Sequence, residues 1–140
     1  MTYPDDFIGK VIQGDCLEVM KQMPDRCVDL VLTDPPFNFE PKGGGLYKKR
    51  GNLKRIDDSF GTDFLPEDFL NAIEPKMKVF NGYFFCSKNI VRNYLNWAQD
   101  RKYGFNILTW HKSNPIPANN NNFLPDTEYV IFIRGKSPTF

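Results

Sequence analysis

The feature that most constrains this chain is a short apolar run that ends abruptly in two prolines. The run is Val28-Asp29-Leu30-Val31-Leu32-Thr33, and Asp34-Pro35-Pro36-Phe37-Asn38 follows it directly. Its short length, its Val and Leu content and its weak alternation are typical of a buried strand in a parallel sheet. The prolines end the strand, because each lacks an N–H and fixes its own φ angle. An acidic group, a rigid turn and an aromatic ring therefore follow the carboxyl end of a predicted strand, where ligands bind in open α/β sheets.

This set of residues suits a reaction at an exocyclic amine of a nucleobase. The lone pair of such an amine is delocalised into the ring, and two hydrogen-bond acceptors aimed at its hydrogens make the nitrogen more nucleophilic. Asp34 supplies a carboxylate acceptor and Pro35 a backbone carbonyl, whose direction Pro36 restricts. Phe37 offers a flat surface for a base taken out of the stack. We therefore predict that these four residues are catalytic, through positioning and electrostatics.

The same stretch resembles the catalytic motif of the amino-methylating DNA methyltransferases, which is Asp-Pro-Pro-Tyr or Asp-Pro-Pro-Phe. Upstream, the resemblance includes Gly14-Asp15-Cys16-Leu17-Glu18-Val19-Met20 and Pro24-Asp25. Downstream, it includes Trp110, Lys112, Asn114, Pro115, Pro117 and Glu128. It covers nearly the whole chain and points to a permuted group of the family, in which the catalytic half precedes the cofactor half.

The resemblance implies an α/β fold, namely a partial, Rossmann-like sheet of an S-adenosylmethionine-dependent methyltransferase with an antiparallel C-terminal strand. It implies direct methyl transfer from S-adenosylmethionine to an exocyclic amine of double-stranded DNA with a flipped base. Adenine N6 is favoured, because the family's cytosine N4 enzymes more often carry Ser where this chain has Asp34. Asp15, Cys16 and Asp34 are the cofactor-binding residues that the resemblance implies. For Asp15, capping of a helix is an alternative, and both roles can hold.

The glycine-rich turn that holds the cofactor in this family has no counterpart in the 140 residues. In the permuted group it would follow residue 140, together with the segment that recognises DNA. We therefore interpret residues 1–140 as the catalytic part of a methyltransferase domain, whose partner is a missing C-terminal half or another chain. By the family's sheet order, a strand at 8–14 lies beyond two missing strands, and the strand at 28–33 is central. The chain would then have an open sheet edge, which invites pairing with a neighbour or a homo-oligomer.

Residues 39–63 combine three glycines with a basic cluster and few apolar residues, which is typical of a loop beside an active site. The basic residues are Lys42, Lys48, Lys49, Arg50, Lys54 and Arg55. They either contact the phosphates around a flipped base, since Lys and Arg neutralise backbone charge, or form a solvated loop. The glycines do not indicate a phosphate-binding loop, because no apolar strand precedes them and no helix clearly follows.

The rest of the chain predicts alternating helices and strands. Helices are expected at 16–23, from Pro66 to a break at Pro75, and at about 88–102, with Ser87 as N-cap and Gly104 as the end. Further strands are expected at 83–86, at 105–111 and, returning antiparallel, at 128–134.

Two aromatic residues and one loop allow more than one interpretation. Trp110 is either a stacking surface or, as is commoner for an aromatic in a strand, part of the core. His111 is the only histidine, and we expect it at a strand end without a catalytic role. The Pro- and Asn-rich residues 112–126 are either a plain connector or a wall of the base pocket.

Composition narrows the remaining classes. A net charge of +1 gives no global basic field, so a DNA partner would depend on a local patch. The chain has no long apolar run and no signal-peptide pattern, so we expect no membrane contact. Cys16, Cys27 and Cys86 lack paired spacing, which suits a reducing cytoplasm. We interpret them as small buried residues, and not as zinc ligands with His111.

A second hypothesis follows from the absent cofactor turn. The chain would then be a truncated or split fragment that is inactive alone and acts as a nucleic-acid-binding or assembly piece. Methylation of a protein glutamine or of an RNA amine is a further alternative, although those relatives usually place Asn before the two prolines. An unrelated nucleotide-binding domain is disfavoured, because the sequence has no phosphate-binding loop.

Overall fold

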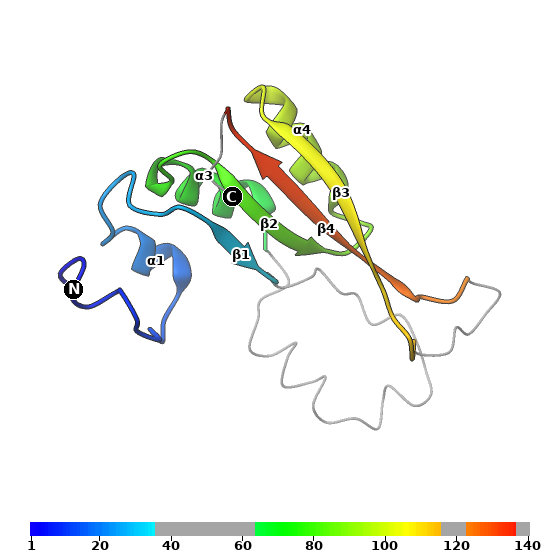
Figure 1. Ribbon diagram of the computed structural model, residues 1–140, viewed down its shortest axis with the longest axis horizontal. Coiled ribbons are helices and arrows are strands. Elements are labelled where there is room, and N and C mark those ends of the chain that lie inside the picture. Colours follow the sequence, from blue (N-terminus) through cyan, green and yellow to red (C-terminus); the bar gives the residue numbers. More distant parts are fainter. Residues whose placement is uncertain (36–63, 116–122, 137–140) are drawn as a thin grey trace.

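The computed structural model describes residues 1–35, 64–115 and 123–136, which form one mixed sheet with helices on one face (Figure 1). The strands are β1 (Val31–Thr33), β2 (Asn81–Cys86), β3 (Gly104–His111) and β4 (Thr127–Arg134). The helices are α1 (Cys16–Met20), α3 (Pro66–Ile73), the short 3₁₀ helix η2 (Glu74–Lys76) and α4 (Val91–Asp100). In the described ranges, none of the helices has the length and apolar character needed to cross a lipid bilayer.

The sheet has the strand order β1-β2-β4-β3. β1 pairs in parallel with β2, and β4 is antiparallel to both β2 and β3. The carboxyl ends of β1, β2 and β3 and the amino end of β4 therefore lie at one edge of the sheet. The predicted α/β fold with an antiparallel C-terminal strand is confirmed.

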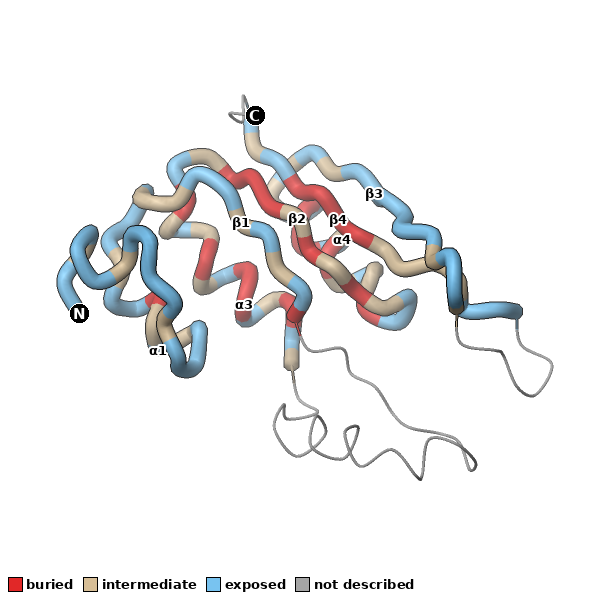
Figure 2. Tube along the Cα trace, turned by 60° about the horizontal axis from the view of Figure 1, so that its bottom comes forward, coloured by how far each residue is buried: buried red, intermediate tan, exposed pale blue. Residues whose placement is uncertain are grey.

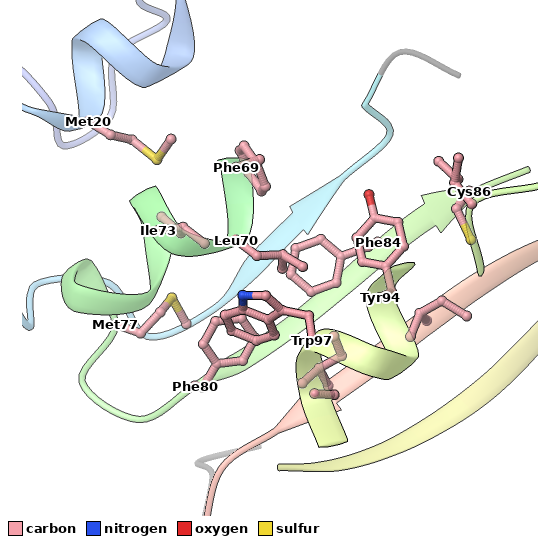
Figure 3. Close-up of a cluster of buried hydrophobic side chains, with 14 residues drawn as sticks. Met20, Phe69, Leu70, Ile73, Met77, Phe80, Phe84, Cys86, Tyr94 and Trp97 are labelled. Atoms are coloured by element: carbon pink, nitrogen blue, oxygen red, sulfur yellow. The ribbon is translucent and has the colours of Figure 1, made fainter. Parts of the chain in front are cut away.

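The core lies between one face of the sheet and the helices α3 and α4 (Figure 3). Alternate residues of β2 and β4 point to this face, as the pleat of a strand requires. Phe84, Cys86, Ile131 and Ile133 are buried there, and Tyr129 is partly buried. The two helices are also joined by polar contacts, since Trp97 Nε1 donates to Asn71 Oδ1 at 2.9 Å and Arg101 Nε to Glu74 Oε2 at 2.9 Å. In the described part of the chain, α3 and α4 thus cover this face of the sheet.

The boundaries of α3 follow the local sequence, whereas those of α1 and α4 depart from it in part. Pro66 starts α3 with acidic residues in the first turn, and Pro75 lies in the 3₁₀ helix that ends it, as predicted. α1 stops at Met20, three residues before the predicted end at 23. α4 starts at Val91 without a side-chain cap, so the predicted cap at Ser87 is wrong.

The reason for the late start of α4 is a turn between the strand and the helix. The Ile90 N–H donates to the Ser87 carbonyl at 3.1 Å, and the Ile90 side chain is buried in the core. Burial of this side chain holds residues 87–90 as a turn instead of a first helical turn. At the other end, the sequence predicted that Gly104 ends the helix. Instead, α4 ends at Asp100, Lys102 adopts a positive φ of 57°, and Gly104 is the first residue of β3.

The amino-terminal part differs most from the prediction. Residues 8–14 form no strand, and the Val11 side chain is fully exposed. β1 lies at an edge of the described sheet and pairs in parallel with β2, which agrees with the predicted open edge and parallel pairing, whereas the predicted burial of 28–33 is wrong (Figure 2). The Leu32 side chain is 68% exposed. A strand needs hydrogen-bonding neighbours, and in the described ranges no strand lies between β1 and residues 8–14.

Candidate active site

The candidate site is built on the first two residues after β1. Asp34 lies exposed at the shared strand-end edge, and Pro35 is buried behind it. Both residues therefore occupy the predicted position. The described segment ends here, so the predicted Pro36 and Phe37 lie outside the described residues. The same holds for the predicted nucleic-acid contacts Lys42, Lys48, Lys49, Arg50, Lys54 and Arg55.

A second carboxylate and a lysine stand across the edge from Asp34. Glu128 is the second residue of β4, and its carboxylate forms an ion pair with Lys112, which directly follows β3. Partial burial, and then the negative charge of Glu128, raise the pKa of Asp34. The Lys112 ammonium group offsets part of the Glu128 charge. Partial burial and a carboxylate at the start of β4 therefore both disfavour the ionised form of Asp34.

The helix side of the same edge contains hydroxyl groups that the sequence did not reveal as site residues. Tyr94, on α4, is fully buried, and its hydroxyl has no hydrogen-bond partner. The Ser87 hydroxyl, directly after β2, is also buried without a partner. The sequence places Tyr94 in the apolar stripe of a helix, where a tyrosine looks like a core residue. Only the position of Ser87, directly after an apolar strand, was a signal for this edge.

Burial controls the ionisable groups beneath the edge. It raises the pKa of the Cys86 thiol to about 11, so this thiol is protonated at neutral pH and is no nucleophile. Burial, and then the charges of Cys86, Glu67 and Asp34, raise the pKa of the Tyr94 hydroxyl, which is therefore a hydrogen-bond donor. Cys86 and Tyr94, which lie beneath the edge, are therefore both uncharged at neutral pH.

The two predicted cofactor residues on the amino-terminal segment lie elsewhere. The Asp15 carboxylate accepts a hydrogen bond from the Leu17 N–H at 2.8 Å and so caps α1. Cys16 is exposed, and partial burial and the Asp15 charge raise its pKa. Figures 1 and 2 both show α1 beside α3 and apart from the end of β1. The structure thus confirms the capping role of Asp15, while the cofactor role of Asp15 and Cys16 stays a prediction.

The other residues that the sequence singled out give mixed results. Cys86 is buried as expected, but the exposed Cys16 contradicts the interpretation of all cysteines as buried residues. Trp110 is 57% exposed, and its ring packs in a T-shaped arrangement with the Phe85 ring, with 5.7 Å between the ring centroids. It is therefore a surface residue and not part of the core. His111 ends β3 as predicted, with Nδ1 3.8 Å from Asp126 Oδ2.

Taken together, fold and site define a class: an α/β domain with a carboxylate and a proline at the edge of the sheet where its parallel strands end. No family model matches the chain. It is 27% identical over 123 residues to the type II methyltransferase M.HinfI of Haemophilus influenzae. The alignment covers 81% of this chain and 34% of that protein. It is 26% identical over 140 residues to the type II methyltransferase M.BamHI of Bacillus amyloliquefaciens, covering 94% of this chain and 30% of that protein.

The solved structures agree on the fold. The crystal structure of an M1.HpyAVI–SAM complex has a TM-score of 0.59 and 19% identity, and the match covers 89% of this chain and 54% of that one. These comparisons confirm the resemblance that the sequence indicated: the chain is related to the type II DNA methyltransferases. It spans about a third of the length of the curated relatives it matches.

Proposed function

We propose that this chain is the catalytic part of an S-adenosylmethionine-dependent DNA methyltransferase that acts on an exocyclic amine, adenine N6. The observation that carries the proposal is the position of Asp34 and Pro35 at the carboxyl end of β1. The similarity to M.HinfI and M.BamHI supports the reaction class. The adenine preference rests on the resemblance alone, through the acidic residue at position 34.

The residues at this edge suit the activation of an amine. In this proposal the Asp34 carboxylate accepts one hydrogen of the amine, and the Pro35 carbonyl accepts the other. With both hydrogens held, the nitrogen lone pair is localised and directed away from the two acceptors. Asp34 has to be ionised for this role. Because burial and Glu128 raise its pKa, the role is lost at a higher pH than for an ordinary aspartate when the solution is acidified.

S-adenosylmethionine, when bound, supplies the methyl group for this amine. Asp34 directly follows β1 at the edge where the parallel strands end, whereas Asp15 and Cys16 lie at the start of α1. The described part of the chain therefore fits only one side of a cofactor site. We propose that a complementary segment, in the same protein or in another chain, provides the other side.

The open face of the sheet supports the need for such a segment. By register, Leu32, Tyr83 and Phe132 lie side by side on the face opposite the helices, and the rings of Tyr83 and Phe132 stack at 4.5 Å. Leu32 and Trp110 are exposed there, and no described helix covers them. Exposed apolar surface of this kind marks an interaction site. We propose that the complementary segment covers this face, in a cytoplasmic enzyme that binds double-stranded DNA with a flipped base.

A chimeric enzyme tests the proposal directly. This chain replaces the segment of M.HinfI that it matches, and DNA treated with the chimera and S-adenosylmethionine is digested and analysed by mass spectrometry. We expect N6-methyladenine from the chimera, none from the chain alone, and none from the chimera with Asp34→Ala. N4-methylcytosine would overturn the adenine assignment. A chimera that is folded and binds DNA and cofactor without methylating would contradict the proposed function.

The second candidate is a nucleic-acid-binding or assembly piece without catalytic activity. The separation of α1 from the end of β1 favours it, because it leaves the cofactor site incomplete in the described residues. This candidate predicts that Asp34→Ala leaves DNA binding unchanged and that no chimera methylates DNA.

A further inference from the structure

The hydroxyl group of Tyr94 is a buried donor that the structure leaves unused. The residue is 0% exposed, and its hydroxyl oxygen has no hydrogen-bond partner. Folded proteins pair nearly all buried polar side-chain atoms, so an unpaired one calls for an explanation. A phenylalanine would fill the same space without this cost. The hydroxyl therefore points to a role that the packing of the core does not explain.

The surroundings of Tyr94 fix its ring and aim its hydroxyl. The ring stacks on Phe84 at 5.4 Å between centroids, within the core between α4 and the sheet. Figure 3 shows the hydroxyl pointing out of this cluster toward the segment that follows β1, where Asp34 and Pro35 lie. The charge of Asp34 is among the groups that act on Tyr94. The view in Figure 3 and the charge interaction with Asp34 together place the Tyr94 hydroxyl near the candidate active site.

Three groups with acceptor atoms act electrostatically on Tyr94, and they differ in acceptor strength and in whether they already have a partner. Cys86 holds a protonated, buried thiol, which is a weak acceptor. Glu67 already accepts a hydrogen bond from Asn93 Nδ2 at 2.8 Å on its Oε1 atom. Asp34 has no hydrogen-bond partner in the part of the chain that the structure describes. Its carboxylate is therefore the acceptor that best matches the free donor.

We propose that Tyr94 is a positioning residue, whose hydroxyl donates a hydrogen bond to the Asp34 carboxylate of the folded chain in solution. A carboxylate has about four lone-pair directions, so Asp34 can accept from Tyr94 and from a substrate amine together. The bond holds the carboxylate at a fixed angle on a rigid support from the core. The use made of this orientation rests on the proposed function, whereas the bond itself does not.

The bond also opposes the groups that disfavour ionised Asp34. Burial and Glu128, at the start of β4, act against the carboxylate, and Lys112 after β3 partly neutralises Glu128. Glu67, on α3, also acts on Tyr94 and carries a like charge. A hydrogen bond donated to the ionised form favours that form. The bond from Tyr94 would therefore favour ionised Asp34 without adding a charge.

The pKa of Asp34, measured by NMR on the 140-residue chain with ¹³C-labelled Asp carboxyls, tests the proposal. Asp34→Asn identifies the signal, and Tyr94→Phe removes only the hydroxyl. We expect the Asp34 pKa to rise in Tyr94→Phe. The matched control is Tyr103→Phe, because the Tyr103 hydroxyl bonds to Glu74 Oε1 at 2.9 Å and not to the site. An Asp34 pKa that is the same in both variants and in the wild type would overturn the proposal.

A second measurement decides the matter without a resolved titration. Urea unfolding of Tyr94→Phe, Asp34→Ala and the double variant forms a double-mutant cycle at neutral pH. We expect the cost of Tyr94→Phe to disappear once Asp34 is absent. Additive effects would overturn the proposal. Neither measurement contains DNA or cofactor, so a failure of the proposed function leaves both results readable.

Discussion

The two faces of the sheet differ in how complete they are. On one face, Phe84 and Ile131 are fully buried against α3 and α4. On the other face, Leu32 and Trp110 are largely exposed, and β1 has no neighbour on its outer side in the described ranges (Figure 2). Asp34 lies at the boundary between them. The covered face therefore holds most of the buried core, and the open face, where Val130 and Phe132 are buried beside the exposed Leu32 and Trp110, is where we expect a partner.

The largest effect should come from the covered face. Phe84→Ala removes a side chain that contacts the rings of Phe69, Phe80 and Tyr94, and should cost about 3–5 kcal/mol of unfolding free energy. Urea denaturation gives the number. Leu32→Ala on the open face is the control, with an expected cost within about 0.5 kcal/mol. Similar costs at both positions would break the comparison.

The open face should instead control association. Leu32→Lys places a charge on the exposed edge strand, where burying a Leu side chain contributes about 1.5–3 kcal/mol. We expect self-association of the chain, or its binding to a complementary segment, to weaken by about tenfold or more. Sedimentation at rising concentration measures this. Lys10→Glu, outside the sheet, is the control, and equal association of Leu32→Lys and the wild type would contradict the proposed surface.

The pKa of Asp34, between the two faces, should depend on the charge of Glu128. Glu128→Gln removes the carboxylate that raises the pKa of Asp34, and so the Asp34 pKa should fall. In the chimeric enzyme, the acid limb of the pH–rate profile should move to lower pH. Asp126→Asn is the matched control, because Asp126 is not among the groups that act on Asp34. A shift of the same size in both variants would refute the role of Glu128.

The smallest effect concerns stability and pH. Since the folded state raises the pKa of Asp34, the folded chain holds this proton more tightly than the unfolded chain. Asp34 therefore lowers stability as the pH rises from the unfolded pKa through the raised folded value. Asp34→Asn should be slightly more stable than the wild type at pH 7, and this difference should vanish in acid. Thermal melts at several pH values would expose the opposite sign.

Much of the fold follows from local chemistry, and those parts were predictable. Pro66 and Pro75 bound a helix because proline fits a first turn and breaks an interior. β3 and β4 follow from apolar runs, and Asp34-Pro35 follows from the two prolines that stop β1. The failures share another cause. Whether 8–14 becomes a strand depends on neighbours far away in the chain, and the use of the Tyr94 hydroxyl depends on what packs above it.

The central claim is that this chain forms one side of a methyltransferase site and needs a complementary segment. Calorimetric titration of S-adenosylmethionine into the chain alone and into the M.HinfI chimera tests it most directly. We expect saturable binding of S-adenosylmethionine by the chimera and none by the chain alone. Equal binding by the chain alone would contradict the incomplete site, and no binding by a folded chimera would contradict the methyltransferase assignment.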